Sequence, residues 1–293
     1  MILCCTFLLV SCNSTEDPYS ATGVFEAEEV IVSAEASGKL LRFDLKEGQE
    51  LNRDTSLGQI DTVQLSLQKM QVTANQLSIQ AGKPDVTSQI RATQREIEKL
   101  EFEKERTKKL LEGDVATQKQ LDDIQAQIDV LNARLTAQKK TLNSSVSAID
   151  AQFAALEVQK EQLEDQIHRC SIKSPIDGIV LVKYVEEGEF VTMGKPLFKV
   201  ANLNELILRA YLTSDQLKDI KLNQKVRVMS EYGVEDTKEY EGTITWISSK
   251  SEFTPKTIQT QDERANLVYA VKVAVKNDGF LKIGMYAALN WNQ

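Results

Sequence analysis

The sequence predicts an α+β protein in which a long antiparallel helical hairpin interrupts one β domain and a second β domain follows. Two stretches, 33–61 and 173–201, share one pattern of short strands and turns. Between them, apolar residues recur with the alternating three- and four-residue spacing of a coiled coil. After residue 200, alternating segments bounded by turn residues indicate further strands.

The composition limits the classes of function. A chain of 293 residues has room for two or three small domains. It carries 35 basic and 43 acidic residues, a net charge of -8, and it has no basic run with interleaved aromatic residues. Because a phosphate backbone selects basic surfaces, we expect no nucleic acid among the partners.

The N-terminal residues MILCCTFLLVSC form an apolar run that fits a signal-peptide core and is too short to span a bilayer. The ending LVSC resembles the lipobox of bacterial lipoproteins. The resemblance implies a signal peptide over 1–11, acylation of Cys12 and a polar tether over 12–19. A disordered apolar leader is the alternative. Once the leader and Cys12 are set aside, Cys170 is the remaining thiol, which favours a structural cysteine.

The two repeats align glycine with glycine, since Gly38 and Gly48 correspond to Gly178 and Gly188. Each copy alternates apolar and polar residues, turns at an E-G step and ends in another strand. The pair resembles the two halves of a biotinyl/lipoyl-type domain. Carrier domains of that type modify a lysine on the hairpin between the halves, but here helices replace the hairpin and neither copy has an M-K-M-like tip. The resemblance therefore implies the fold without a cofactor, with halves at 31–61 and 170–202.

The insert, 62–169, has the strongest periodicity. Its second limb carries an apolar seam with steps of three and four residues: Leu121, Ile124, Ile128, Leu131, Leu135, Gln138, Leu142, Ser145, Ile149, Gln152, Leu156, Gln159 and Leu163. The first limb offers an antiparallel partner seam: Val63, Leu67, Met70, Ala74, Leu77, Ala81, Ile90, Ile97, Leu100 and Leu111. Glycine and proline in AGKPDVT predict a break at 81–87, and the helix-weak NSSVS at 143–147 lies across from it. We therefore expect a shared joint or a shift in the coiled coil there.

The stretch RTKKLLEGDVATQKQLDD predicts the tip of the hairpin, near 113–117. Lys109 suits the last turn of a helix, and Gly113 suits the C′ position that follows a helix end. Thr117 and Gln120 have the spacing of a capping box at the start of the next helix.

Arg106, Leu110 and Thr117, with Gly113 between them, resemble the R-x3-L-x6-S tip motif of periplasmic adaptor subunits, the HlyD-like membrane fusion proteins, with Thr in place of Ser. In that family the tip docks on the periplasmic end of a TolC-type outer-membrane channel. The resemblance implies that these four residues form the docking site. Taken one at a time, Thr117 is also explained as a helix cap and Leu110 as an apolar helix residue.

Residues 203–293 resemble the β-barrel domain of the same family, and 20–30 would supply its first strand. The resemblance completes the expected fold: a long antiparallel α-helical coiled-coil hairpin inserted in a split biotinyl/lipoyl-like β domain, followed by a β-barrel domain. The stretches 253–273 and 281–289 resemble adaptors of ABC-type exporters. The expected absence of a membrane-proximal domain after the barrel favours the same partner.

No arrangement of residues typical of catalysis or metal binding is visible. The single histidine, His168, and the carboxylate pairs Asp122-Asp123 and Glu186-Glu187 are interpreted as solvated or packed residues. We expect no enzyme activity, no cofactor and no metal.

The resemblance implies a lipid-anchored periplasmic adaptor of a Gram-negative bacterium, held at the inner membrane and assembled as a homo-hexamer. It would link an inner-membrane transporter to a TolC-type outer-membrane channel. An ABC exporter is the favoured transporter, and a resistance-nodulation-division pump is the second candidate. A lipid-anchored coiled-coil spacer or scaffold that binds no channel is the alternative function.

Overall fold

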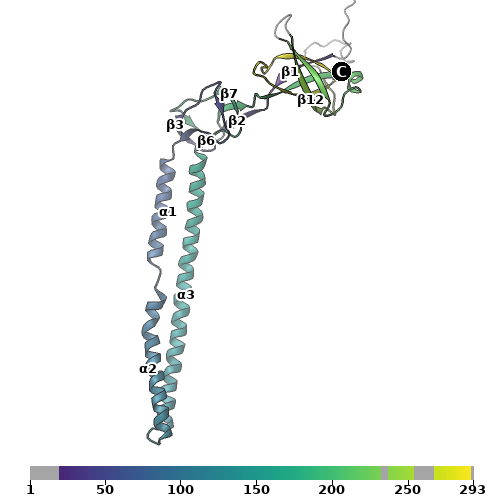
Figure 1. The fold of residues 1–293 in the computed structure, drawn as a ribbon. Coiled ribbons are helices and arrows are strands. Elements are labelled where there is room, and N and C mark those ends of the chain that lie inside the picture. The colour runs from purple at the N-terminus through teal and green to yellow at the C-terminus, as the bar shows by residue number, and fades with distance from the viewer. Residues whose placement is uncertain (1–19, 232–236, 254–266, 292–293) are drawn as a thin grey trace, which may run out of the picture. The chain divides into compact units, whose positions relative to one another are not determined.

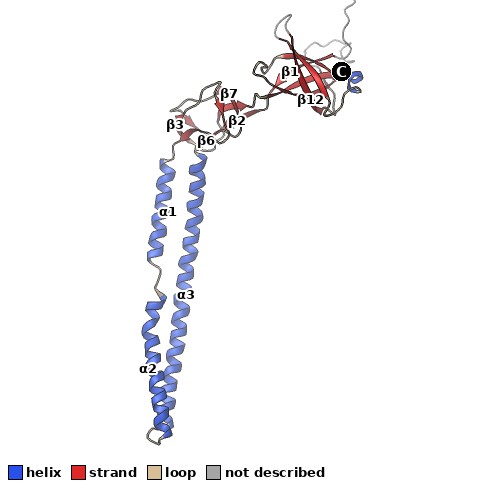
Figure 2. Cartoon of the chain, in the orientation of Figure 1, coloured by secondary structure: helices blue, strands red, loops and turns tan. Residues whose placement is uncertain are grey.

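The computed structural model describes residues 20–231, 237–253 and 267–291. The predicted leader, the tether and Cys12 lie outside these residues. The chain divides into two compact units, one of 61–171 and one that combines the residues before and after it. This is the α+β arrangement predicted from the sequence, with a helical hairpin between β segments (Figure 2).

Three helices build the hairpin. Helices α1 (Val63–Ala81) and α2 (Val86–Glu112) follow one another along a single long helix, α3 (Gln118–Arg169) (Figure 1). With 52 residues at 1.5 Å per residue, α3 is about 80 Å long. Among the described residues, no helix combines the length and the apolar composition needed to cross a bilayer.

The predicted break in the first limb is confirmed. Helix α1 ends at Ala81 with Gly82 as its C-cap, and Asp85 caps α2 by accepting a hydrogen bond from the Ser88 amide at 3.1 Å. The joint predicted at 143–147 in the second limb is wrong, because α3 is continuous there. That segment contains neither glycine nor proline, and the modest helix penalty of Asn and Ser is too small to end a packed helix.

The predicted shift in the coiled coil does occur. Beyond Leu142 the seam of α3 runs through Val146, Ile149, Phe153, Leu156, Lys160 and Leu163, while Ser145, Gln152 and Gln159 of the predicted seam are exposed. The seam thus takes two successive four-residue steps, 138 to 142 and 142 to 146. Such a stutter locally unwinds a coiled coil, and it lies close to the break between α1 and α2.

The seam predicted for α1 is on the wrong face. Val63, Leu67, Met70 and Leu77 are exposed, by 61%, 54%, 67% and 64%, and Ala74 and Ala81 are exposed too. The face that packs on α3 is more polar: Leu65, Lys69, Val72, Gln76 and Ile79. The polar members of this face have partners on α3, which apolar periodicity cannot reveal.

The split β domain consists of two four-stranded sheets, and each sheet mixes strands from both sequence repeats. One has the order β2 (Glu29–Ser33), β9 (Pro196–Ala201), β7 (Gly178–Lys183) and β4 (Glu50–Leu51). The other has the order β6 (Ser171–Lys173), β5 (Ser56–Ile60), β3 (Gly38–Phe43) and β8 (Phe190–Val191).

Equivalent hydrogen bonds join the two repeats. The Gly48 amide donates to the Val180 carbonyl at 2.8 Å, and the Gly188 amide donates to the Leu40 carbonyl at 2.8 Å. Both glycines have positive φ, 80° and 90°, which explains why the repeat keeps glycine at this turn. The two halves therefore close on one another in a pseudo-symmetric way.

The second β domain is a barrel. Its strands are β1 (Ser20–Glu26), β10 (Glu205–Thr213), β11 (Lys225–Glu231), β12 (Thr237–Ile247), β14 (Leu267–Lys276) and β15 (Tyr286–Asn290). They run in the order β10-β1-β15-β11-β12-β14, and the pairing of β10 with β14 closes the barrel. The short β13 (Glu252–Phe253) pairs with the start of β14, and the short helix α4 (Ser214–Leu217) follows β10. The core contains Phe25, Leu208, Val228, Val273 and Leu289.

Candidate functional site

The candidate site is the turn between α2 and α3. Helix α2 ends with Gly113 at its C-cap, where φ is -98°, and Asp114 follows with a φ of 54°. The Asp114 amide donates to the Leu111 carbonyl at 3.1 Å, and the Val115 amide donates to the Leu110 carbonyl at 2.9 Å. This pair of bonds is a Schellman motif.

The prediction that Gly113 occupies the left-handed C′ position is therefore wrong by one residue. Asp114 holds that position because a short polar side chain tolerates the left-handed conformation better than most others. Gly113 stays in the turn with its α-carbon exposed.

The predicted capping box at the start of α3 is confirmed. The Thr117 hydroxyl accepts a hydrogen bond from the Gln120 amide at 3.4 Å, and the Gln120 side-chain oxygen accepts one from the Thr117 amide at 2.9 Å. These bonds satisfy backbone donors that the helix itself leaves unpaired. The turn is thus held rigidly from both sides.

The tip presents its side chains to solvent. Arg106 and Leu110 lie one turn apart on α2, so they share a face of the helix. Arg106 is exposed and makes no side-chain hydrogen bond or ion pair with any described residue, and Leu110 is 40% exposed. Thr117 is also exposed. An unpaired guanidinium beside an exposed leucine is typical of a surface that binds a protein partner.

Sequence reasoning missed Val115. Its side chain is 76% exposed at the end of the turn, more than any other large apolar residue described. An apolar residue in the otherwise polar turn GDVAT was the signal that could have identified it. We give the name tip surface to the set formed by Arg106, Leu110, Gly113, Val115 and Thr117.

The hairpin also has two lateral surfaces that no other described part of the chain covers. One is the exposed apolar face of α1: Val63, Leu67, Met70, Ala74, Leu77 and Ala81. The other is a face of α3 made of small or uncharged residues, all of them exposed: Ala126, Val130, Ala133, Ala137, Thr141, Ser144, Ala148, Ala151, Ala155 and Val158. We call them the α1 stripe and the α3 stripe. Each lies on the side of its helix away from the seam within the hairpin.

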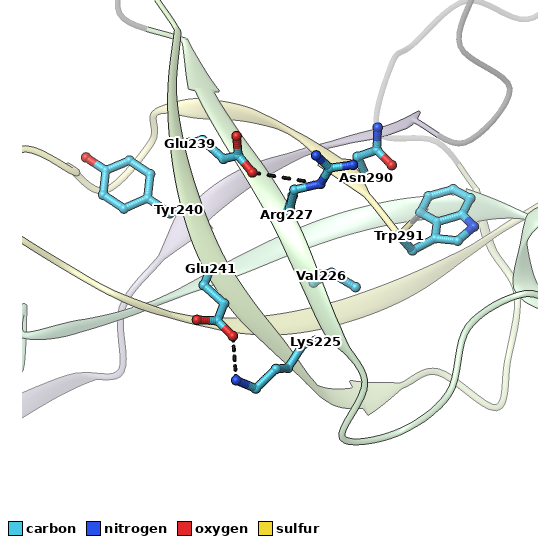
Figure 3. A pocket seen from close by; sticks show the side chains of 8 residues that line it. All are labelled: Lys225, Val226, Arg227, Glu239, Tyr240, Glu241, Asn290 and Trp291. Atoms are coloured by element: carbon cyan, nitrogen blue, oxygen red, sulfur yellow. Dashed lines mark ion pairs between the residues drawn. The ribbon is translucent and has the colours of Figure 1, made fainter. Parts of the chain in front are cut away.

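The pockets do not have the chemistry of an active site. Figure 3 shows a 370 Å³ pocket of the barrel, in which Lys225 pairs with Glu241 at 2.6 Å and Arg227 pairs with Glu239 at 3.8 Å. The hydrogen bond from Lys225 to Glu241 raises the pKa of this lysine above its ordinary value, so the side chain stays protonated and has no lone pair to accept a proton. Charges paired in this way stabilise each other.

The other candidate residues from the sequence make contacts typical of a structural role. Asp122 accepts a hydrogen bond from Gln118 at 2.8 Å, and Glu186 pairs with Lys183 at 2.6 Å. Cys170 is 1% exposed and its thiol donates to the Gln166 carbonyl at 3.3 Å, while burial raises its pKa. A buried, protonated thiol agrees with the predicted structural role. His168 is exposed in the last turn of α3.

Three comparisons with known proteins bear on the identity of the chain. Residues 28–203 match the family described as RND MFP, barrel-sandwich hybrid domain. A curated relative, the UPF0194 membrane protein in asrC 5'region of Acidithiobacillus ferridurans, is 36% identical over 113 residues. That match covers 38% of this chain and 33% of the relative, so the chain spans about a third of the relative's length.

Solved structures share the fold at low identity. MacA from Actinobacillus actinomycetemcomitans is 20% identical with a TM-score of 0.56, over 94% of this chain and 79% of that one. A MacA-MexA chimera that contains the Pseudomonas aeruginosa MexA α-hairpin is 22% identical with a TM-score of 0.54, over 92% and 79%. A membrane fusion protein of Streptococcus pneumoniae R6 is 13% identical with a TM-score of 0.50, over 94% and 98%. Since the family match covers more than half of the chain, this protein belongs to the membrane fusion protein family, the non-enzymatic periplasmic adaptors.

Proposed function

We propose that this adaptor serves a tripartite export system, in which it joins an inner-membrane transporter to a TolC-type outer-membrane channel. The observation that carries the proposal is the tip surface, where Arg106 and Leu110 at the end of α2 and Val115 in the turn are exposed. The turn is held by a Schellman motif and a capping box. A rigid turn loses little conformational entropy when it binds, which favours docking.

The chemistry of the tip surface suits the ends of helices in a channel protein. The guanidinium of Arg106 can donate several hydrogen bonds in a fixed geometry to carbonyl or carboxylate oxygens. Leu110 and Val115 can fill grooves between helices, and the Thr117 hydroxyl retains a lone pair and a proton beyond its cap. An isolated spacer would not need an unpaired arginine beside two exposed apolar side chains.

The lateral stripes support assembly into a ring, the homo-hexamer that the family resemblance implies. The α1 stripe contributes large side chains and the proximal part of the α3 stripe contributes small ones, so the first can pack into the second on a neighbouring copy. The two surfaces differ, so the contact is heterologous and repeats around a closed ring. The hairpins would then stand side by side as a wall of helices.

The anchor and the transporter belong to the same proposal. Acylation of Cys12 would hold the chain at the inner membrane of a Gram-negative cell, where multiple acyl chains give stable attachment. The resemblance of 253–273 and 281–289 to ABC-exporter adaptors favours an ABC transporter. The matching family is described by the RND class, which keeps an RND pump as the second candidate.

A cross-linking experiment in the native envelope tests the function. Wild-type protein, Arg106→Glu and Leu110→Asp are cross-linked under mild conditions, purified and identified together with their partners by mass spectrometry. Arg95→Glu is the matched control, since Arg95 is equally exposed on α2 but lies away from the tip. We expect wild-type protein and the control to recover an outer-membrane channel and an inner-membrane transporter, and the tip variants to lose the channel alone.

The same experiment decides for or against the alternative function. A coiled-coil spacer would recover neither membrane protein, and the tip variants would behave like the wild type. An intact-mass measurement of the purified chain tests the predicted anchor. Acylation at Cys12 would add a defined lipid mass to the chain that begins at this residue.

A further inference from the structure

Five outward-facing side chains form a row across five neighbouring strands of the barrel. The strand register places Tyr286 opposite Val24, Val24 opposite Arg209, Arg209 opposite Lys272, and Lys272 opposite Trp246. None of the five is buried, whereas the strand neighbours Phe25, Leu208, Ala210, Val271, Val273 and Ala287 belong to the core. We call these residues the cationic row: Tyr286, Val24, Arg209, Lys272 and Trp246.

The centre of the row places two positive charges directly opposite each other. Like charges at such a position on adjacent strands destabilise a sheet. Arg209 has one carboxylate partner, Glu252 on β13, at 2.9 Å. Lys272 has no ion pair with any carboxylate among the described residues. Among the described residues, one positive charge of this pair therefore has no carboxylate partner, in a protein whose net charge is -8.

One hydrogen-bond donor of Arg209 has no acceptor among the described residues. Its terminal nitrogen donates to both oxygens of Glu252, at 3.2 and 2.9 Å. Its Nε is shielded from solvent and has no hydrogen-bond partner among the described residues. A shielded donor without an acceptor costs free energy, so the position of Arg209 is held at some expense of stability.

Aromatic rings flank the two cations. The Lys272 ammonium lies 5.7 Å from the centre of the Trp246 ring, and the Arg209 guanidinium lies 5.8 Å from the Tyr211 ring. Trp246 is 42% exposed and Tyr286 is 63% exposed. Tryptophan, tyrosine and arginine are the residues that dominate the binding energy of protein interfaces.

From these observations we infer that the cationic row binds an acidic segment of a partner protein. A carboxylate of that segment pairs with Lys272, while an apolar neighbour covers the Trp246 ring. The surface is separate from the tip surface, so the inference goes beyond the proposed docking on the outer-membrane channel.

A protein segment fits this surface better than an anionic bilayer does. The carboxylates of Glu252 and Glu26 lie close enough to Arg209 to act on it electrostatically. A flat layer of anionic headgroups would have to approach these carboxylates as well as the cations. A single carboxylate on a protruding segment can reach Lys272 alone.

Site-specific photo-cross-linking in the native envelope tests the inference. A benzoylphenylalanine replaces Trp246 in the full chain, and a second chain carries it at Leu222, which is 59% exposed on the same domain. We expect an adduct with a partner protein from position 246 only, mapped to a peptide that contains Asp or Glu. A further Lys272→Glu substitution should lower the yield of this adduct at least fivefold.

Two comparisons make the result specific. Lys276→Glu, an exposed lysine on the same strand, should leave the yield unchanged. Reversing the mapped acidic residue of the partner to Lys should restore the adduct of the Lys272→Glu chain. An adduct with lipid, an adduct with a second copy of this chain, the lack of an adduct, or a yield unaffected by Lys272→Glu would each overturn the inference. In parallel, a chain with benzoylphenylalanine at Leu110 tests docking of the tip surface. Failure of the proposed channel docking and failure of the cationic-row inference are therefore seen separately.

Discussion

The side-chain amide of Gln76 donates a 2.6 Å hydrogen bond to Glu157 across the hairpin, from a position that is only 4% exposed. It is the middle of three polar contacts at seven-residue intervals along the two limbs, the last of which uses Lys83 in the break after α1. Lys69 pairs with Glu164 at 3.0 Å, and Lys83 pairs with Asp150 at 2.8 Å. The heptad position of α1 that holds Lys69 and Gln76 is therefore polar, which specifies register at some expense of stability.

Loss of this hydrogen bond should loosen the proximal part of the hairpin. We expect Gln76→Ala to lower the thermal midpoint of helix unfolding by roughly 2–4 °C, as a loss of about 1 kcal/mol does in a protein of this size. Circular dichroism at 222 nm measures it. Gln159→Ala is the control, because Gln159 is exposed on α3. Equal shifts in both variants would contradict the observed seam.

Acid should weaken the same contact. Hydrogen bonds from Gln76 and then Lys160 lower the pKa of Glu157 below its ordinary value of 4.5. A lowered pKa in the folded state stabilises the fold above the unfolded pKa, and this stabilisation is lost as the pH falls through the folded value. We expect the thermal midpoint to fall between pH 6 and pH 3, and to fall less in Glu157→Gln. An identical pH dependence in both chains would exclude Glu157 as a contributor.

The two roles of Thr117 can be separated by substitution. Asp is as good an N-cap as Thr but has no hydroxyl proton, so Thr117→Asp should keep the stability of α3 and weaken capture of the channel. Thr117→Ser should keep both. Thermal unfolding and the cross-linking yield of the channel measure the two effects. If Thr117→Asp captures the channel normally, the hydroxyl acts as a cap alone.

The lateral stripes predict how copies associate. Leu77→Asp places a charge in the α1 stripe and Ala155→Glu places one in the α3 stripe, so each should shift the purified protein toward monomer in sedimentation velocity. Both positions are exposed within one copy, so the helix content should stay unchanged. Glu101→Lys, an exposed change on α2, is the control. An unchanged sedimentation coefficient in both stripe variants would show that these faces do not mediate assembly.

Two glycines of the split β domain should respond differently to alanine. Gly48 has a φ of 80° and open space around its α-carbon, so Gly48→Ala should cost about 1–2 kcal/mol from backbone conformation alone. At Gly178 an added Cβ would lie 2.4 Å from the Ala201 carbonyl oxygen, so Gly178→Ala should cost more because two strands must separate. Denaturant unfolding of the two variants checks the order. A larger loss for Gly48→Ala would contradict the packing of β7 against β9.

The sequence by itself determined the features that depend on local chemistry or on simple periodicity. The glycine spacing of the repeats predicted two interlocking halves, Gly82 and Pro84 predicted the break in the first limb, and Thr117 with Gln120 predicted the cap of α3. Each of these signals lies within a few residues or repeats visibly along the chain, so no knowledge of distant contacts is needed to interpret it.

Only the tertiary structure decided which face of α1 packs, since that face depends on Lys69 and Gln76 meeting Glu164 and Glu157. The same holds for the cationic row, whose members come from five strands and meet only through their pairing. The physical reason is common to both. Burial of apolar area follows from each residue separately and so leaves a periodic pattern in the sequence. A polar contact stabilises the fold only when its partner, far away in the chain, lies in register.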